Sequence, residues 1–64
     1  MFEAYRMLRD ERGLTDYAVA MATGIPRSTF TEWKQGRYQP KIEKIARLAR
    51  FFGVTIGYFY GEED

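Results

Sequence analysis

The chain has 64 residues, with ten Lys and Arg against nine Asp and Glu, and it has no cysteine and no histidine. A domain of this size buries only about 60% of the surface that its unfolded chain exposes, which leaves little room for a large catalytic cleft. The missing residue types exclude disulfides, structural zinc, thiol chemistry and the commonest general base, so we expect no enzyme, no metal site and no cofactor.

The spacing of apolar residues predicts five short helices and no strand. We expect the first over residues 2–12 and the second from the cap Thr15 to about Thr23, each closed by a glycine in the left-handed conformation, Gly13 and Gly24. The side chains expected to face inward are those of Tyr5, Leu8, Val19 and Ala20, with Thr23 at the edge.

Three more helices are expected in the second half of the chain. Pro26 suits the first position of the third helix, and Pro40 or Lys41 opens the fourth. Thr55 is a candidate cap for a short fifth helix over residues 56–60. The side chains expected to face inward are those of Phe30, Trp33, Ile42, Ile45, Ala46, Ala49, Phe52 and Phe59.

Residues 16–35 hold two of these helices, joined by a turn so short that they must cross at a steep angle. Only a small side chain allows close approach at the crossing, where Ala20 stands, and Gly24 follows four positions later to supply the left-handed residue of the turn. The residues that can pack the inner faces are Ile25, Phe30 and Trp33. Each feature is common by itself, but the joint spacing is specific for a helix-turn-helix.

This stretch resembles the helix-turn-helix of the Xre family, which includes lambdoid phage repressors and Cro proteins, over LTDYAVAMATGIPRSTF, residues 14–30. The likeness covers nearly the whole chain and includes Leu8-Arg9, Gly13-Leu14-Thr15, Trp33 before Gly36, Pro40, Ile45-Ala46 and Phe52-Gly53-Val54-Thr55. It implies a compact, all-α, five-helix lambda-repressor-like domain over residues 1–64, whose third helix enters the major groove of a double-stranded DNA operator. It also implies a transcription regulator of phage or prophage type, foremost a repressor.

The resemblance assigns DNA base-reading positions to Arg27 and Ser28, at the start of the third helix, and to Glu32 one turn later. Arg27 has an argument of its own, because a guanidinium can form two hydrogen bonds to O6 and N7 of guanine. Two alternatives stay open. Arg27 can instead clamp a phosphate, and Glu32 can pair with a nearby cation.

Seven basic and two acidic residues lie between Arg27 and Arg50, which suits a polyanionic partner, although solvated helix faces would also explain the charge. Resemblance and charge together indicate phosphate contacts around the start of the fourth helix, where free N–H groups also favour anions. The residues expected to contact phosphates are Arg37, Tyr38 and Lys41, with Thr29, Thr31 and Lys34 as additions.

Two positions depart from the family pattern. The family often has a glutamine at the start of the second helix that contacts a phosphate, whereas this chain has Asp16, which would repel one. The family also pairs the arginine that follows the first-helix leucine with a glutamate, whereas Arg9 would here face Lys34. That ion pair cannot form, and we expect Lys34 to reach DNA instead.

The fifth helix carries more apolar surface than so short a helix can easily hide. Because members of the family often dimerise through this end, we expect a weak homodimer through Tyr58 or Tyr60, the alternative being that both tyrosines complete the monomer core. The chain ends soon after this helix, which suits either a Cro-sized protein or the N-terminal domain of a longer repressor.

A protein-binding module with the same fold, such as an antitoxin or anti-repressor, is the second functional hypothesis. An enzyme would need a cluster of reactive groups, whereas Asp16, Glu32 and Glu43 are scattered among cations. No apolar run approaches the roughly 20 residues of a membrane span, and charges at Glu3 and Arg6 do not suit a signal peptide. We therefore expect a soluble, cytoplasmic protein with no membrane partner.

Overall fold

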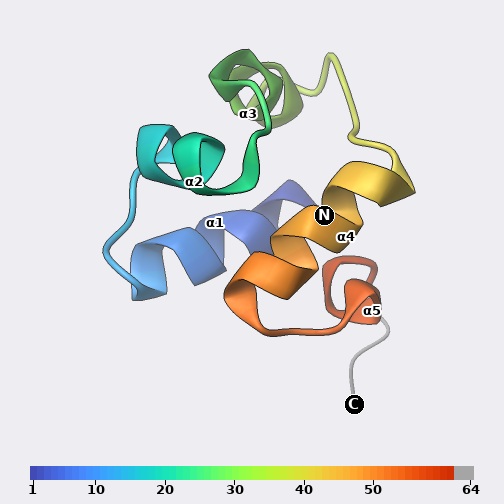
Figure 1. Cartoon of the computed structure of the whole chain (residues 1–64). Coiled ribbons are helices and arrows are strands. Elements are labelled where there is room, and N and C mark those ends of the chain that lie inside the picture. The colour runs from blue at the N-terminus through green and yellow to red at the C-terminus, as the bar shows by residue number, and fades with distance from the viewer. Residues whose placement is uncertain (62–64) are drawn as a thin grey trace.

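The structure, a computed structural model, describes residues 1–61 as helices joined by short turns (Figure 1). The helices are Phe2–Glu11 (α1), Asp16–Thr23 (α2), Arg27–Lys34 (α3), Ile42–Phe52 (α4) and Ile56–Phe59 (α5). Within residues 1–61 there is no strand, so the all-α, five-helix prediction is confirmed. The last three positions of the predicted 1–64 domain lie outside the described residues. None of the helices in the described part is long and apolar enough to cross a membrane.

The predicted caps at the starts of α2 and α5 are confirmed. Thr15 Oγ1 accepts a hydrogen bond from the N–H of Ala18 at 3.0 Å, and Thr55 Oγ1 accepts one from the N–H of Tyr58 at 3.3 Å. These oxygens serve N–H groups that have no acceptor in the first turn of a helix. Pro26 differs by one position from its prediction, because it is the residue before α3 rather than the first residue in it.

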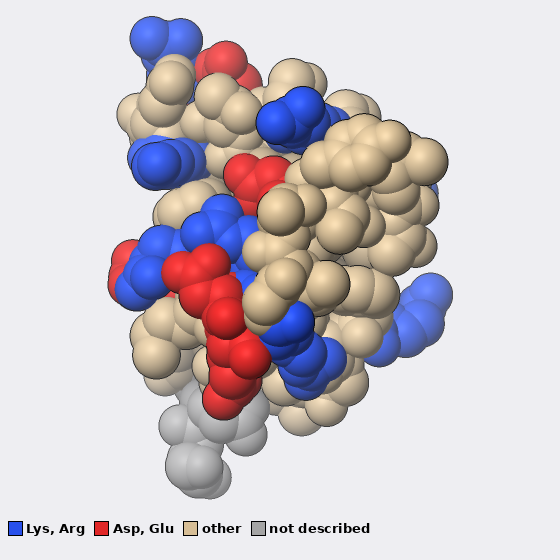
Figure 2. Space-filling view, turned by 90° about the vertical axis from the view of Figure 1, so that its left-hand side faces the viewer, with Lys and Arg blue, Asp and Glu red and all other residues tan. Residues whose placement is uncertain are grey.

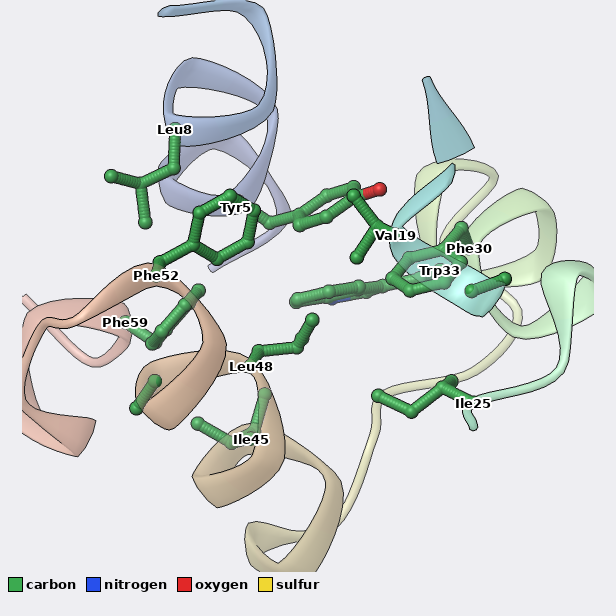
Figure 3. Packing of buried hydrophobic residues seen from close by; sticks show 12 residues of the cluster. Tyr5, Leu8, Val19, Ile25, Phe30, Trp33, Ile45, Leu48, Phe52 and Phe59 are labelled. Atoms are coloured by element: carbon green, nitrogen blue, oxygen red, sulfur yellow. The ribbon is translucent and has the colours of Figure 1, made fainter. Parts of the chain in front are cut away.

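The core is organised around Tyr5 of α1, which is fully buried. Its ring stacks on Phe30 with centroids 4.7 Å apart and on Trp33 at 5.5 Å, and it meets Phe52 edge-on at 6.2 Å (Figure 3). Each aromatic pair of this kind adds about 0.5–1.5 kcal/mol beyond the burial of its area. One aromatic cluster therefore joins α1, α3 and α4. The other buried apolar residues are Leu8, Val19, Ala20, Ile25, Ile45, Leu48, Ala49 and Phe59.

The prediction that Ile42 faces inward is wrong, because its side chain is 63% exposed. Ile42 is the first residue of α4 and lies at the edge of the apolar stripe, where little of the domain covers it. Leu48, which the spacing argument did not select, is fully buried, and Ala46 is only half-buried. The buried stripe of α4 thus begins at Ile45, about one turn later than predicted, and includes Leu48 in place of Ala46.

α3 lies at one end of the domain, at the top of Figure 1. It packs against α2, and through Phe30 and Trp33 it rests on Tyr5 of α1. α4 packs against both α2 and α5, and α1 packs against α5. This arrangement leaves the outer side of α3 turned away from the rest of the chain.

Candidate nucleic-acid interface

The turn between α2 and α3 has the geometry that the sequence predicts. Gly24 adopts the left-handed conformation, with φ of 78° and ψ of 8°, and its N–H donates to the carbonyl of Ala20 at 2.9 Å. Thr23 Oγ1 donates to the carbonyl of Val19 at 2.8 Å and accepts from the N–H of Ile25 at 3.3 Å. Ala20 and Ile25 are buried, as expected. Side-chain and backbone bonds together therefore fix the angle at which α3 leaves α2.

α3 has one buried face and one exposed face. Phe30 and Trp33 are buried against the core, as predicted. Ser28, Thr31 and Gln35 are exposed and recur at a spacing of three or four residues, which places them on one outer stripe of the helix. A helix with such a stripe of short polar side chains can present hydrogen-bonding groups to a surface that it lies against.

The cations around α3 have few partners within the domain. Arg27, Lys34 and Lys41 are exposed and make no ion pair with any residue of 1–61. Arg37 Nη1 lies 3.8 Å from Glu32 Oε1, and both side chains are exposed. An ion pair at such a site contributes only about 0–1 kcal/mol, so Arg37 can exchange Glu32 for a stronger anion. Figure 2 shows Lys and Arg side chains around a small acidic patch at the end where α3 lies.

The loop after α3 and the start of α4 carry further groups that can bind a phosphate. Tyr38 is 37% exposed, and Lys41 is the residue that precedes the helix. The N–H groups of Ile42 and Glu43 have no backbone acceptor within residues 1–61, so they add positive potential beside Lys41. Thr29, in contrast, is half-buried on the flank of α3 and is the least accessible of the predicted phosphate contacts.

Some of the basic residues between positions 27 and 50 do not lie on this surface. Arg47 bonds to Glu43 with Nε at 2.6 Å from the carboxylate, and its Nη1 donates to the carbonyl of Thr23 at 3.5 Å. Arg47 therefore serves the carboxyl end of α2, where unpaired carbonyls favour a cation. Arg50 borders the same hollow between α2 and α4. The basic residues of this stretch are thus divided between the surroundings of α3 and the hollow between α2 and α4.

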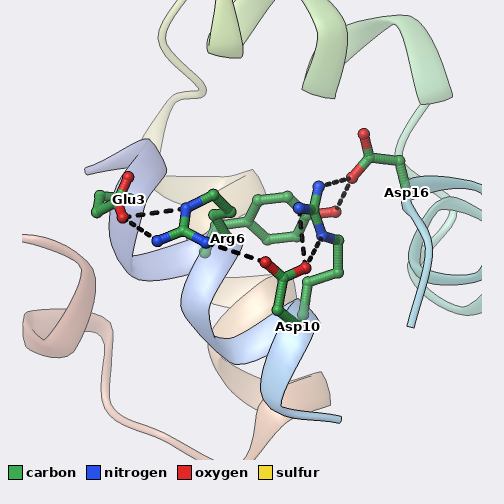
Figure 4. A network of polar contacts seen from close by, with 6 residues as sticks. Glu3, Arg6, Asp10 and Asp16 are labelled. Atoms are coloured by element: carbon green, nitrogen blue, oxygen red, sulfur yellow. Dashed lines mark hydrogen bonds and ion pairs between the residues drawn. The ribbon is translucent and has the colours of Figure 1, made fainter. Parts of the chain in front are cut away.

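Asp16, the first departure from the family pattern, and Arg9, which the second departure leaves without its family partner, belong to one network (Figure 4). Asp16 Oδ1 accepts a hydrogen bond from the Tyr5 hydroxyl at 2.6 Å and another from Arg9 Nη1 at 2.9 Å. Arg9 also pairs with Asp10 at 2.9 Å, and Lys34 takes no part. Arg9 therefore finds its carboxylate partners at the end of α1 and the start of α2, and not after α3, where the family pattern has its glutamate.

The network changes how Asp16 should be interpreted. Its carboxylate is turned to α1 and neutralised by Arg9, so it does not stand as a free negative charge at the start of α2. Burial, followed by the hydrogen bond to Asp16, raises the pKa of the Tyr5 hydroxyl far above its ordinary value. Hydrogen bonds to Asp10 and then Asp16 raise the pKa of Arg9. Both donors thus stay protonated and hold α2 against α1.

The turn geometry, the buried inner faces and the exposed outer stripe agree with the family comparison. Residues 6–59 match the model of a family described as helix-turn-helix. The chain belongs to this family. The resemblance to Xre-type helix-turn-helix regulators is thereby confirmed over most of the domain.

Several curated proteins resemble this helix-turn-helix domain. It is 34% identical over 59 residues to the cryptic phage CTXphi transcriptional repressor RstR of Vibrio cholerae, a match that covers 92% of this chain and 53% of RstR. It is 27% identical over 62 residues to the transcriptional activator BcrR of Enterococcus faecalis, covering 97% of this chain and 30% of BcrR. An uncharacterized HTH-type transcriptional regulator of Methanocaldococcus jannaschii is 33% identical over 60 residues, or 94% of this chain and 86% of that protein.

The domain spans about half the length of RstR and about a third of BcrR, the first two relatives above. No solved structure matches the chain significantly.

Two exposed residues of the helix-turn-helix domain escaped the sequence analysis. The ring of Tyr17, in the first turn of α2, lies below the guanidinium of Arg27, with Arg27 Cζ 6.0 Å from the ring centroid. Gln35 extends the outer stripe of α3. The helical spacing from Ser28 to Gln35 is a signal that could have found Gln35, whereas only the fold brings Tyr17 to Arg27.

At the other end of the helix-turn-helix domain, α5 is partly covered. Phe59 is buried, as predicted, and Tyr58 is half-buried with its ring edge-on to Phe59 at 5.8 Å. Tyr60 follows the helix and is 40% exposed. Some aromatic surface therefore remains outside the core at this end, as the sequence predicts.

Proposed function

We propose that this helix-turn-helix domain binds double-stranded DNA with α3 in the major groove and regulates transcription as a repressor. The observation that carries the proposal is the exposed outer stripe of α3 beside cations that have no ion-pair partner in residues 1–61. A helix fits the width of the major groove, and unpaired cations favour a polyanion. Repression is chosen over activation because RstR, a phage repressor, is more similar in sequence than the activator BcrR.

The proposed roles divide between reading bases and holding the backbone. Arg27 and Ser28 read bases from the first turn of α3, with Glu32 one turn later. Glu32 also has a partner within the domain, because Arg37 Nη1 lies 3.8 Å from Glu32 Oε1. A phosphate that attracts Arg37 would release the Glu32 carboxylate to accept a hydrogen bond from a cytosine amino group. The residues proposed to contact phosphates are Thr29, Thr31, Lys34, Arg37, Tyr38 and Lys41.

The experiment compares Arg27→Ala with Lys41→Ala. A preferred site is first selected from random-sequence DNA, and each variant is then titrated with that site and with a scrambled duplex at several salt concentrations. Arg27→Ala should weaken the preferred site by about 1–3 kcal/mol and relax the preference at one base pair. Lys41→Ala should weaken both duplexes equally and reduce the slope of log K against log salt by about one unit.

Arg50→Ala is the matched control. Arg50 is also an exposed arginine without an ion pair in residues 1–61, but it borders the hollow between α2 and α4. Its loss should leave the base preference unchanged. If Arg27→Ala instead weakens both duplexes equally with a flatter salt dependence, Arg27 is a phosphate clamp. If neither Arg27→Ala nor Lys41→Ala affects binding, the DNA-binding proposal is wrong and the antitoxin or anti-repressor hypothesis replaces it.

We also propose a weak homodimer through α5. The support is the aromatic surface of Tyr58 and Tyr60, together with the two-fold symmetry that half-sites about 34 Å apart would require. Sedimentation velocity of the parent and of Tyr60→Ala, with and without DNA, tests it. Tyr60→Ala should associate more weakly and stay folded, because Tyr60 is exposed. A parent that remains monomeric even on a symmetric site would refute the dimer.

A further inference from the structure

The first turn of α2 presents an aromatic ring to solvent next to the start of α3. Tyr17 is 57% exposed, and Arg27 Cζ lies 6.0 Å from its ring centroid, within the range of a cation–π contact. Among the hydrogen bonds, ion pairs and ring contacts within residues 1–61, this is the one that involves the Arg27 side chain. Two other arginines, Arg9 and Arg12, also lie over aromatic rings, but both have hydrogen bonds as well.

Both partners of this contact are held by short, well-fixed segments. Tyr17 follows Asp16, which is bonded to α1 through Tyr5 and Arg9 (Figure 4). Arg27 is the first residue of α3, directly after the turn that Gly24 closes. The ring therefore has a defined position relative to the base of the Arg27 side chain, although its own surface is open.

An aromatic ring in a cation–π contact constrains an arginine differently from a carboxylate. An ion pair occupies the N–H donors at the edge of the guanidinium, whereas a ring contacts its flat face and leaves the edge donors free. A long arginine side chain loses much rotational freedom when it binds, and a preorganised plane reduces that loss. A guanine needs the edge donors of an arginine, so a cation–π contact leaves the required atoms available.

We propose that Tyr17 is a positioning residue for Arg27, whose ring orients the guanidinium plane so that its edge donors meet a guanine in the major groove. This inference rests on the proposed function, because it assigns Tyr17 a part in base reading. Tyr17 acts through Arg27 and makes no specific base contact of its own. The effect belongs to the aromatic ring and not to the hydroxyl.

The test is a double-mutant cycle of Tyr17→Leu and Arg27→Ala, with Tyr17→Phe as the matched control that retains the ring. The readout is the affinity ratio between the selected duplex and the same duplex with the guanine replaced. Tyr17→Leu should lower this ratio about two- to fivefold, the size of an exposed cation–π contact, and Tyr17→Phe should leave it unchanged. In the Arg27→Ala background, Tyr17→Leu should have no further effect on it.

A second readout uses the free protein and needs no DNA. In the parent and in Tyr17→Phe, the ring current of residue 17 should shift the side-chain NMR resonances of Arg27. This shift should disappear in Tyr17→Leu. Melting curves of the three proteins should be similar, because Tyr17 is largely exposed.

The possible results distinguish a failure of the Tyr17 positioning role from a failure of base reading by Arg27. If Tyr17→Leu lowers the ratio equally with and without Arg27, Tyr17 contacts DNA itself and the inference is wrong. If Arg27→Ala removes the base preference but Tyr17→Leu does not, base reading stands and the positioning role is refuted. If Arg27→Ala leaves the preference unchanged while the ring-current shift is present, base reading by Arg27 fails, and the positioning role fails with it.

Discussion

Replacing Asp16 by asparagine removes one negative charge from the contact between α1 and α2 and keeps the shape of the side chain. Asp16 Oδ1 accepts from the Tyr5 hydroxyl at 2.6 Å and from Arg9 Nη1 at 2.9 Å, and the side chains of Asp16 and Arg9 are 28% and 19% exposed. Hydrogen bonds to a charged group contribute about 1.5–3 kcal/mol each. Because the site is partly open to solvent and asparagine keeps one acceptor oxygen, we expect a total loss of about 1–3 kcal/mol.

Thermal and urea unfolding followed by circular dichroism measure this loss. For a domain of this size, each kcal/mol lowers the melting temperature by about 4–8 °C. Asp10→Asn is the control, since Asp10 also pairs with Arg9 but its side chain is 49% exposed, so it should lower the melting temperature clearly less than Asp16→Asn does. Equal melting temperatures for the parent and Asp16→Asn would refute the reasoning, and so would equal losses in Asp16→Asn and Asp10→Asn.

Three further outcomes follow from the same contacts. Gly24→Val should destabilise by about 1–2 kcal/mol because a branched side chain is forced to φ of 78°, and an unchanged melting temperature would contradict this. Lys34→Glu should change stability by less than about 0.5 kcal/mol, since Arg9 is already bonded to Asp16, while weakening DNA binding; a clear rise in melting temperature would show that Arg9 prefers the new carboxylate. Tyr5 keeps its proton in the fold at pH values where the unfolded chain ionises, so stability should be complete below about pH 10 and fall above it, and Tyr5→Phe should flatten that fall in urea unfolding; parallel pH curves would argue against it.

Short-range signals in the sequence were sufficient for the helices and for the turn. Thr15 and Thr55 cap the helices that follow them, and Gly24 is left-handed, because each of these roles depends on bonds between residues a few positions apart. The buried set was also largely predictable, since apolar residues at helical spacing have one face in common. The prediction for Ile42 was wrong because the spacing of apolar residues does not show where a helix extends beyond the core.

The candidate site was less accessible to sequence reasoning. Arg27, Ser28 and Lys41 were chosen from a resemblance and are exposed, but their DNA contacts remain predictions. Gln35 could have been found from the outer stripe of α3. The division of basic residues between α3 and the hollow between α2 and α4 could not, because charge counted along a chain does not show which surface each residue joins.

By itself, the sequence determined the class of the fold, the order and approximate bounds of its helices, and the helix-turn-helix between α2 and α3. Only the tertiary structure decided that Asp16 bonds to Arg9 and Tyr5, and that the ring of Tyr17 lies against Arg27. The physical reason is one of range. Caps, turns and helical faces arise from neighbours within about one turn of helix, whereas the partner of a charged or aromatic side chain depends on how separate helices pack.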